Sequence, residues 1–111
     1  MLSQKYRFHS RGGVNFVYQK GTSYRTSTLN LITHPNARGF QRFAVVVSKK
    51  VLKSAVGRNR IRRRIYEAIR LELPHFPPAR DYIFVVHNND YTNLPFLTIR
   101  QTIRGLVDRI E

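Results

Sequence analysis

The chain has 111 residues and no cysteine, which limits it to one domain and excludes disulfide scaffolds, cysteine-bound metals and thiol nucleophiles. Its 20 Lys and Arg residues oppose 6 Asp and Glu residues, a formal net charge of +14, so we expect a polyanionic partner. No apolar run approaches the ~20 residues of a membrane span, and the first residues do not resemble a signal peptide. A cytoplasmic location without membrane contact is therefore expected.

The first half of the chain is expected to form one helix and two strands. Residues 14–18 precede Gly21, and glycine commonly ends helices, so this segment predicts a short helix. Apolar and polar residues alternate over 28–33 and again over 42–48, which predicts two half-buried strands. Turn-forming residues at 34–39 lie between them, so the two strands are expected to pair as a hairpin.

The second half is expected to form a helix, a central strand and a last helix. The first of these helices runs from about Ala55 or Arg58 to Leu73, where the following proline ends it, and its apolar residues fall on one stripe. Residues 81–87 would be apolar on both faces of a strand, as in the centre of a sheet. Asn93 is expected to cap the last, amphipathic helix.

This order of elements predicts an α+β sandwich, a single domain over residues 1–111 in which helices pack on one small sheet. The basic helix would connect two strands of that sheet. Parallel crossovers of this kind are right-handed in ~98% of cases. From this general frequency alone, a right-handed crossover is expected.

The positive charge is concentrated in residues 49–70, where nine cations accompany a single acid, Glu67. A solvent-exposed helix normally interleaves acids with its basic residues, and the five arginines of 58–64 would repel one another without a polyanion. Guanidinium groups match phosphate oxygens and stack on bases, so nucleic acid is the predicted partner. A membrane surface is disfavoured because this segment lacks an aromatic, apolar opposite face.

Candidate catalytic and metal-binding residues are few. His9, His34, His75 and His87 are far apart and show none of the spacings of metal-binding motifs, so surface or loop positions are expected. Ser48 precedes two lysines, and in so basic a segment a hydroxyl that contacts phosphate is favoured over a nucleophile. We therefore predict no catalytic residue and no metal ligand within this chain.

The segment from Ser48 to Arg70, SKKVLKSAVGRNRIRRRIYEAIR, resembles the signature of the bacterial ribonuclease P protein subunit. That family combines an S-K-K-V strand end, an R-N-R-I motif and a helix containing E-A-x-R. The similarity extends to Arg7-Phe8 and to residues 17–21 and 81–86. The chain departs from the family pattern where Val14 and Ile32 replace aromatic residues and where Tyr66 replaces a basic one.

The resemblance implies the element order α-β-β-(β)-α-β-α, a small mixed sheet and a left-handed crossover through the basic helix, against the general frequency given above. It also implies a function as the protein cofactor of ribonuclease P, in which an RNA subunit cleaves precursor tRNA at the 5′ end of the mature tRNA. The RNA would bind most of the Mg²⁺, and the protein alone would be inactive. Its partners would be ribonuclease P RNA and precursor tRNA, with no obligate protein partner.

The resemblance implies two RNA-binding surfaces. The basic segment would bind the ribonuclease P RNA through Lys49, Lys50, Lys53, Arg58, Asn59, Arg60, Arg62 and Arg63. The outward face of the strands would hold the single-stranded 5′ leader of precursor tRNA in a groove lined by Phe8, Tyr18, Thr28, Asn30, Ile32, Arg42 and Ser48. Arg58, Arg60 and Arg62 are expected to bind phosphates while contributing little to the packing of the fold.

Several alternatives remain open. Asn59 could cap the basic helix, Phe8 and Phe16 could pack in the core, and Tyr18 could be a core residue of the first helix. A ribosomal or other structured-RNA-binding protein would use the same basic helix without a leader groove. A helix-turn-helix DNA-binding protein would need base-reading side chains, whereas this exposed face is nearly all arginine.

Overall fold

The computed structural model describes residues 2–8 and 11–110 of the chain. This part of the chain forms three α-helices and four β-strands in the order α1-β1-β2-β3-α2-β4-α3, with short 3-10 helices between them. The helices are α1 (Arg11–Lys20), α2 (Ala55–Glu72) and α3 (Phe96–Val107), and the 3-10 helices are η1 (Gln4–Tyr6), η2 (Leu73–His75) and η3 (Asn89–Thr92). The strands are β1 (Thr22–Arg25), β2 (Leu29–Pro35), β3 (Arg42–Val47) and β4 (Arg80–Val86).

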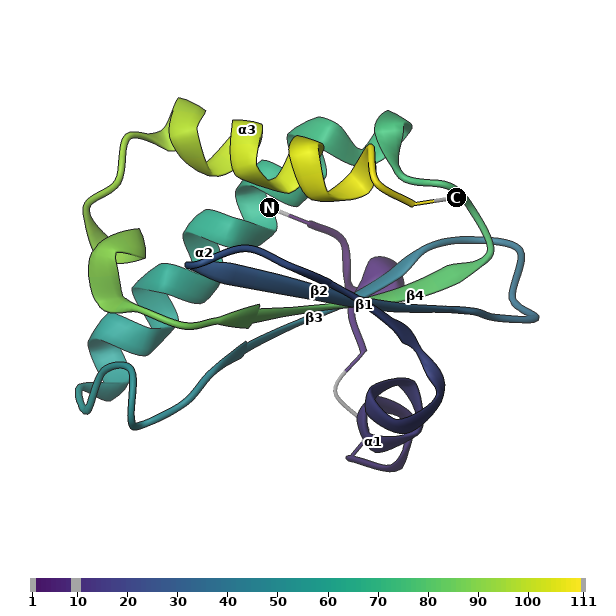
Figure 1. The fold of residues 1–111 in the computed structure, drawn as a ribbon, viewed down its shortest axis with the longest axis horizontal. Helices are drawn as coiled ribbons and strands as arrows, with labels where there is room; N and C mark the ends of the chain where they lie inside the picture. The colour runs from purple at the N-terminus through teal and green to yellow at the C-terminus, as the bar shows by residue number, and fades with distance from the viewer. Residues whose placement is uncertain (1, 9–10, 111) are drawn as a thin grey trace.

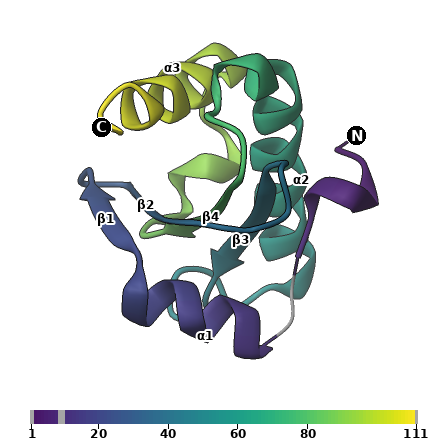
Figure 2. The same ribbon diagram turned by 90° about the vertical axis from the view of Figure 1, so that its right-hand side faces the viewer.

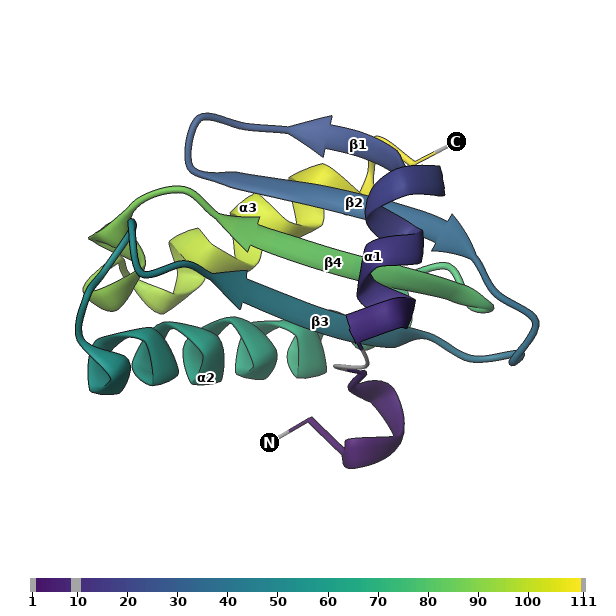
Figure 3. The same cartoon turned by 90° about the horizontal axis from the view of Figure 1, so that it is seen from below.

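The four strands form one mixed sheet in the order β1-β2-β4-β3. β4 lies between β2 and β3, antiparallel to the first and parallel to the second, so the predicted hairpin of β2 with β3 is wrong. The reason lies in β4 itself, which has apolar residues on both faces and buries them only in a central position. The chain between β2 and β3 crosses over the end of β4 instead of turning tightly (Figure 3).

The helices cover both faces of the sheet. α2 and α3 pack on one face and α1 crosses the other (Figures 1 and 2). From β3 the chain passes through α2 and returns into β4 parallel to β3, and Figure 3 shows that this crossover is left-handed. The resemblance implied this rare hand, and the expectation from general frequency is wrong here.

β1 is the strand that hydrophobic alternation did not predict. Its sequence, Thr22-Ser-Tyr-Arg25, carries one apolar side chain, and only that of Tyr24 is half-buried. β1 is an edge strand and pairs antiparallel with β2 alone. An edge strand of this kind leaves almost no period-two signal in its sequence.

Each face of the sheet has its own hydrophobic core. On the α2 and α3 side, Leu31, Phe84 and Ile65 belong to the larger core, and all three side chains are fully buried. The smaller core beneath α1 joins Phe8, Val17, Ile32, Ala44 and Ile83. The α1 face therefore has a closed centre, and its remaining surface lies at either side of the helix.

Glycine at position 21 lets α1 approach the sheet closely. A Cβ atom there would lie 2.6 Å from the Val17 carbonyl oxygen and 2.9 Å from Cγ2 of Ile32. The predicted end of the first helix at this glycine is confirmed, since α1 stops one residue earlier. None of the described helices is long and apolar enough to cross a membrane.

The helices α2 and α3 are capped differently at their N-termini. Ser54 caps α2, and its hydroxyl accepts a hydrogen bond from the Gly57 N–H at 3.1 Å. Pro95 stands at the N-cap of α3, which has no side-chain cap bond. The predicted cap at Asn93 is wrong, because Asn93 instead ends η3, where its N–H donates to the Asp90 carbonyl.

Candidate nucleic-acid interface

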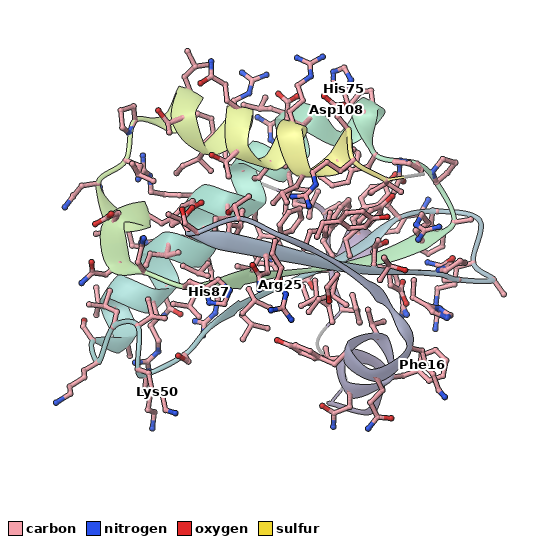
Figure 4. The ribbon with its side chains drawn as sticks, in the orientation of Figure 1. Phe16, Arg25, Lys50, His75, His87 and Asp108 are labelled. Carbon is pink, nitrogen blue, oxygen red and sulfur yellow. The ribbon has the colours of Figure 1, made fainter. Side chains whose placement is uncertain are left out.

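A loop of residues 48–54, here called the lysine loop, joins the end of β3 to the first turn of α2. Lys49, Lys50 and Lys53 are all exposed on it. Figure 4 shows Lys50 projecting from the end of the molecule at which β3 stops. The structure thus places the three lysines together, and none of them has an ion pair with a described residue.

Arg58 binds the lysine loop rather than projecting freely. Its Nη1 donates to the carbonyl oxygens of Leu52 at 2.9 Å and Lys53 at 2.7 Å. Gly57 beside it admits the Leu52 side chain, since a Cβ there would lie 2.4 Å from Cδ2 of Leu52. The expectation that Arg58 contributes little to packing is therefore wrong: it anchors the loop that carries the lysines.

Arg60 and Arg64 face η3. Nε of Arg60 donates to the Thr92 carbonyl at 3.1 Å, and Nη1 of Arg64 donates to the Tyr91 carbonyl at 2.6 Å. Arg64 also donates to the Leu94 carbonyl. Burial, and secondarily the charge of Arg60, lowers the pKa of Arg64 below its ordinary value. Both arginines hold the segment before α3, so the expectation that Arg60 contributes little to the packing of the fold is also wrong, although Arg60 remains exposed.

The opposite side of α2 is open and basic. Asn59, Arg62 and Arg63 line a hollow of about 270 Å³ together with Arg7 and Tyr66. The Asn59 amide oxygen accepts a hydrogen bond from Nη1 of Arg62 at 2.7 Å. Because Ser54 caps the helix, the alternative in which Asn59 is the cap is wrong, and Asn59 lies one turn further on.

Tyr66 separates this hollow from a second one on the sheet. The second hollow measures about 280 Å³ and lies between α1, β3 and Tyr66, lined also by Phe8, Val14, Asn15, Ala44, Val45 and Val46. The Arg7 guanidinium lies over the Tyr66 ring at 5.3 Å. Burial raises the pKa of Tyr66. The two hollows share the Tyr66 wall, and the pair, which runs from the sheet to α2, is here called the Tyr66 groove.

Sequence reasoning treated Tyr66 only as a departure from a family pattern and missed its position as a shared wall. Asn15 was also missed, because one polar residue in a short helix carries no distinguishing signal. Strand alternation, by contrast, predicts that Ala44 and Val46 share the face of the sheet opposite Val45, and the structure confirms this: Ala44 and Val46 pack in the small core under α1 and Val45 in the larger core.

Three residues predicted to contact the leader are instead buried in the protein or paired with another of its side chains. Phe8 and Ile32 are only 5% and 6% exposed and belong to the small core under α1, so for Phe8 the core alternative is right. Arg42 donates to both Asp81 carboxylate oxygens, at 2.9 and 2.8 Å, and its guanidinium lies 4.6 Å from the Phe8 ring centroid. These residues support the groove from below rather than offering free surface.

Thr28 lies on the other side of the sheet. Its hydroxyl is 2.9 Å from the Tyr91 hydroxyl, and it lines a hollow with Gln101 and Thr102 of α3. The predicted place of Thr28 on the α1 face is wrong, because it precedes β2 in a turn where strand alternation does not apply: the Thr26 N–H and hydroxyl both donate to the Leu29 carbonyl.

The other leader candidates lie on the α1 face or at its end. Tyr18 is 42% exposed on α1, one turn after Val14, and partial burial raises its pKa. Asn30 stands on β2 with a buried amide oxygen that has no hydrogen-bond partner among the described residues. Ser48 is exposed where β3 ends. Phe16 is 51% exposed and lies edge-on to His34 at 5.2 Å, so its core alternative is wrong.

The histidines that the structure describes are dispersed. His34 Nδ1 lies 2.6 Å from the Pro35 carbonyl, His75 lies 2.8 Å from Arg104, and His87 is exposed after β4. His9 falls outside the described residues. Within residues 2–8 and 11–110, no three His, Asp or Glu side chains come together as metal ligands.

Comparison with known proteins identifies the family. The Ribonuclease P family model matches residues 2–111. A ribonuclease P protein component from Roseiflexus castenholzii is 31% identical over 97% of this chain and 88% of its own length. One from Microcystis aeruginosa is 43% identical over 77% and 74%.

Solved structures share the fold. The ribonuclease P protein from Thermotoga maritima has a TM-score of 0.85 at 22% identity, covering 95% of this chain and 97% of its own. The Staphylococcus aureus protein has a TM-score of 0.79 at 26% identity, covering 93% of both chains. The chain therefore belongs to the ribonuclease P family, as a protein component of that ribonucleoprotein endoribonuclease.

Proposed function

We propose that the chain binds the ribonuclease P RNA through α2 and the lysine loop, and the 5′ leader of precursor tRNA through the α1 face of the sheet. The observation that carries this proposal is the Tyr66 groove, whose two hollows share Tyr66 as a wall, one beside α2 and one on the α1 face of the sheet. A single strand leaving one RNA could follow this groove onto the sheet.

The exposed cations supply the first surface. Lys49, Lys50, Lys53 and Arg63 are free to contact phosphates, and the exposed Arg60 adds to them. Arg62 and Asn59 bond each other at the mouth of the Tyr66 groove and offer a guanidinium and an amide to the RNA there. Arg58 acts by positioning, since it fixes the loop from which the lysines project.

The α1 face supplies the second surface. Ala44 and Val46 line the second hollow with short side chains that leave room for an extended strand of RNA. Tyr18 is exposed on α1 one turn after Val14, which lines the same hollow, so it can offer an aromatic ring to a base there. Stacking on an aromatic ring is tolerant of base identity. A groove of this kind suits leaders that differ in sequence from one tRNA precursor to the next.

The chemistry falls to the RNA in this proposal. Hydrolysis of the phosphodiester at the 5′ end of the mature tRNA requires Mg²⁺, and the described residues hold no three-residue carboxylate or histidine cluster to bind it. Phosphate oxygens of the RNA would hold most of the metal, while the protein neutralises phosphates and holds the leader. The protein alone would be inactive; we place the assembly in the cytoplasm and assign it no obligate protein partner.

The experiment is 5′ processing of a precursor tRNA by the matching RNA at low Mg²⁺, with and without this chain. We expect cleavage at the mature 5′ end only when RNA is present, and faster cleavage when the chain is added. A rate that the chain leaves unchanged at every Mg²⁺ concentration would contradict the proposal, as would cleavage by the chain alone.

A further inference from the structure

We infer that Arg25 forms the far end of the leader groove and binds a phosphate of the leader at a nucleotide distant from the cleavage site. The inference rests on the proposed function and adds to it a dependence on leader length. Nothing in the sequence pattern assigned a role to Arg25, which lies outside the basic segment on the unpredicted strand β1.

The sheet register brings Arg25 to the α1 face. It pairs with Asn30 of β2, which pairs with Val85 of β4, which pairs with Val46 of β3. Side chains paired in this way share one face of a sheet. Val46 and Val85 pack against the small core under α1, which identifies the face, whereas Tyr24 beside Arg25 packs in the opposite core.

The side-chain view agrees with the register. Figure 4 shows Arg25 and His87 on the side of the sheet where α1 lies, and both are nearer than Phe16 to the end that carries Lys50. Arg25 therefore lies on the side of α1 that faces the Lys50 end, and Phe16 lies on the other side.

The backbone of Arg25 is held in place from the opposite layer. Its carbonyl oxygen accepts a hydrogen bond from Nη1 of Arg109 at 2.9 Å, and the same Arg109 guanidinium lies over the Tyr24 ring at 5.7 Å. This contact fastens the end of β1 to the segment after α3. An anchored backbone presents a side chain with less loss of conformational entropy on binding.

The Arg25 guanidinium is not engaged by any described residue of the protein. It is exposed and makes no hydrogen bond or ion pair with a described residue, whereas the guanidinium groups of Arg42, Arg58 and Arg64 are all engaged by carboxylate or carbonyl oxygens. An exposed, unpaired guanidinium at the rim of a groove is suited to bind phosphate.

Arg25 and α2 stand at opposite edges of the sheet. β1 and β3 are the two edge strands, three interstrand spacings or ~14 Å apart. Since the α2 side would bind the RNA that cleaves the substrate, leader nucleotides nearest the cleavage site would lie at the β3 edge. Only a leader long enough to cross the sheet would then reach Arg25.

The test measures the affinity of the assembled ribonucleoprotein for precursor tRNAs whose leaders are lengthened one nucleotide at a time, with mature tRNA as the zero point. The variants are Arg25→Ala and Arg25→Lys. The matched control is Arg38→Ala, which removes the same charge from an exposed position in the turn after β2.

For the unaltered chain we expect affinity to rise with leader length in more than one step. Arg25→Ala should lose only the last step, roughly three- to tenfold in affinity, and for long leaders the slope of log K against log[salt] should flatten by about 0.7. Arg25→Lys should keep most of that step, and Arg38→Ala should follow the unaltered chain.

Two results would overturn the inference. Arg25→Ala could weaken short leaders and mature tRNA as much as long leaders, or it could leave the whole length series unchanged. Either result would still be consistent with a leader-binding groove on the α1 face if precursor tRNA binds more tightly than mature tRNA. A series with no dependence on leader length in the unaltered chain would instead contradict the proposed function.

Discussion

Nη1 of Arg58 lies 2.9 Å from the carbonyl oxygen of Leu52, and this hydrogen bond ties the first turns of α2 to the lysine loop. The same nitrogen also binds the Lys53 carbonyl at 2.7 Å. Arg63, one and a half turns along the helix, is exposed and has no hydrogen bond to a described residue. Two arginines of one basic helix therefore differ in what they contribute to the fold.

We predict that Arg58→Ala lowers both stability and RNA affinity, whereas Arg63→Ala lowers RNA affinity alone. Losing the two carbonyl contacts of Arg58 should cost ~1–2 kcal/mol, which corresponds to a melting temperature lower by roughly 4–12 °C. Arg63→Ala should leave the melting temperature unchanged and flatten the salt slope of RNA binding by about 0.7–0.9. Equal melting temperatures for the two variants would contradict the anchoring role of Arg58.

The close contact of α1 with β2 predicts opposite effects at two glycines. Gly21→Ala would place Cβ 2.9 Å from Cγ2 of Ile32 and from the Thr33 carbonyl oxygen, both on β2, so we expect a loss of ~1–3 kcal/mol in the free energy of unfolding. Gly12→Ala meets no atom within 4 Å and improves helix propensity within α1, so a gain of up to ~1 kcal/mol is expected. Urea denaturation of both variants measures the difference. A Gly21→Ala protein as stable as the original would show that the helix can move away at no cost.

Buried tyrosines predict a loss of stability at alkaline pH. Burial raises the pKa of Tyr82, whose hydroxyl donates to the Pro77 carbonyl at 2.5 Å, and burial also raises that of Tyr91. The folded state then keeps protons that the unfolded chain releases above about pH 10, so the free energy of unfolding should fall as pH rises beyond that value.

Tyr82→Phe separates this effect from packing. The variant loses the bond to Pro77 and should be less stable by ~1 kcal/mol at neutral pH, yet its stability should decline less steeply above about pH 10. Unfolding free energies measured from pH 8 to 11 give both slopes. Parallel curves for the two proteins would mean that Tyr82 does not cause the alkaline loss.

The elements with strong periodicity were predictable from the sequence. The apolar stripe of α2 and the two-sided apolar pattern of β4 correspond to structures whose side-chain spacing is regular. Strand pairing was not predictable in the same way, because the short turn after β2 favoured a local hairpin while the burial of β4 required a central position. Long-range burial determined the topology.

The candidate site divides along similar lines. Which strand residues point outward follows from alternation, and the basic helix follows from charge. Which arginines are free does not follow from the sequence. Arg42 is bound by Asp81, which is distant in the sequence, and Arg58 is bound by the lysine loop, whose conformation no sequence pattern indicates. Tyr66 reaches the groove from α2 only through tertiary structure, and the place of Arg25 on the α1 face follows only from the register of β1.

The measurement that tests the central claim most directly is the affinity of the assembled ribonucleoprotein for precursor and for mature tRNA, before and after Tyr18→Ala. Tyr18 is 42% exposed on α1, one turn after Val14 of the Tyr66 groove, so its loss should remove one stacked base from the leader, ~1–3 kcal/mol or roughly five- to a hundredfold in affinity. Mature tRNA has no leader and should bind as before. Phe16→Ala removes the other exposed aromatic of α1, which lies against His34 and does not line the Tyr66 groove, and should change neither affinity. Equal losses for precursor and mature tRNA, accompanied by a lower melting temperature, would show that Tyr18 supports the fold and would contradict a leader site on this face.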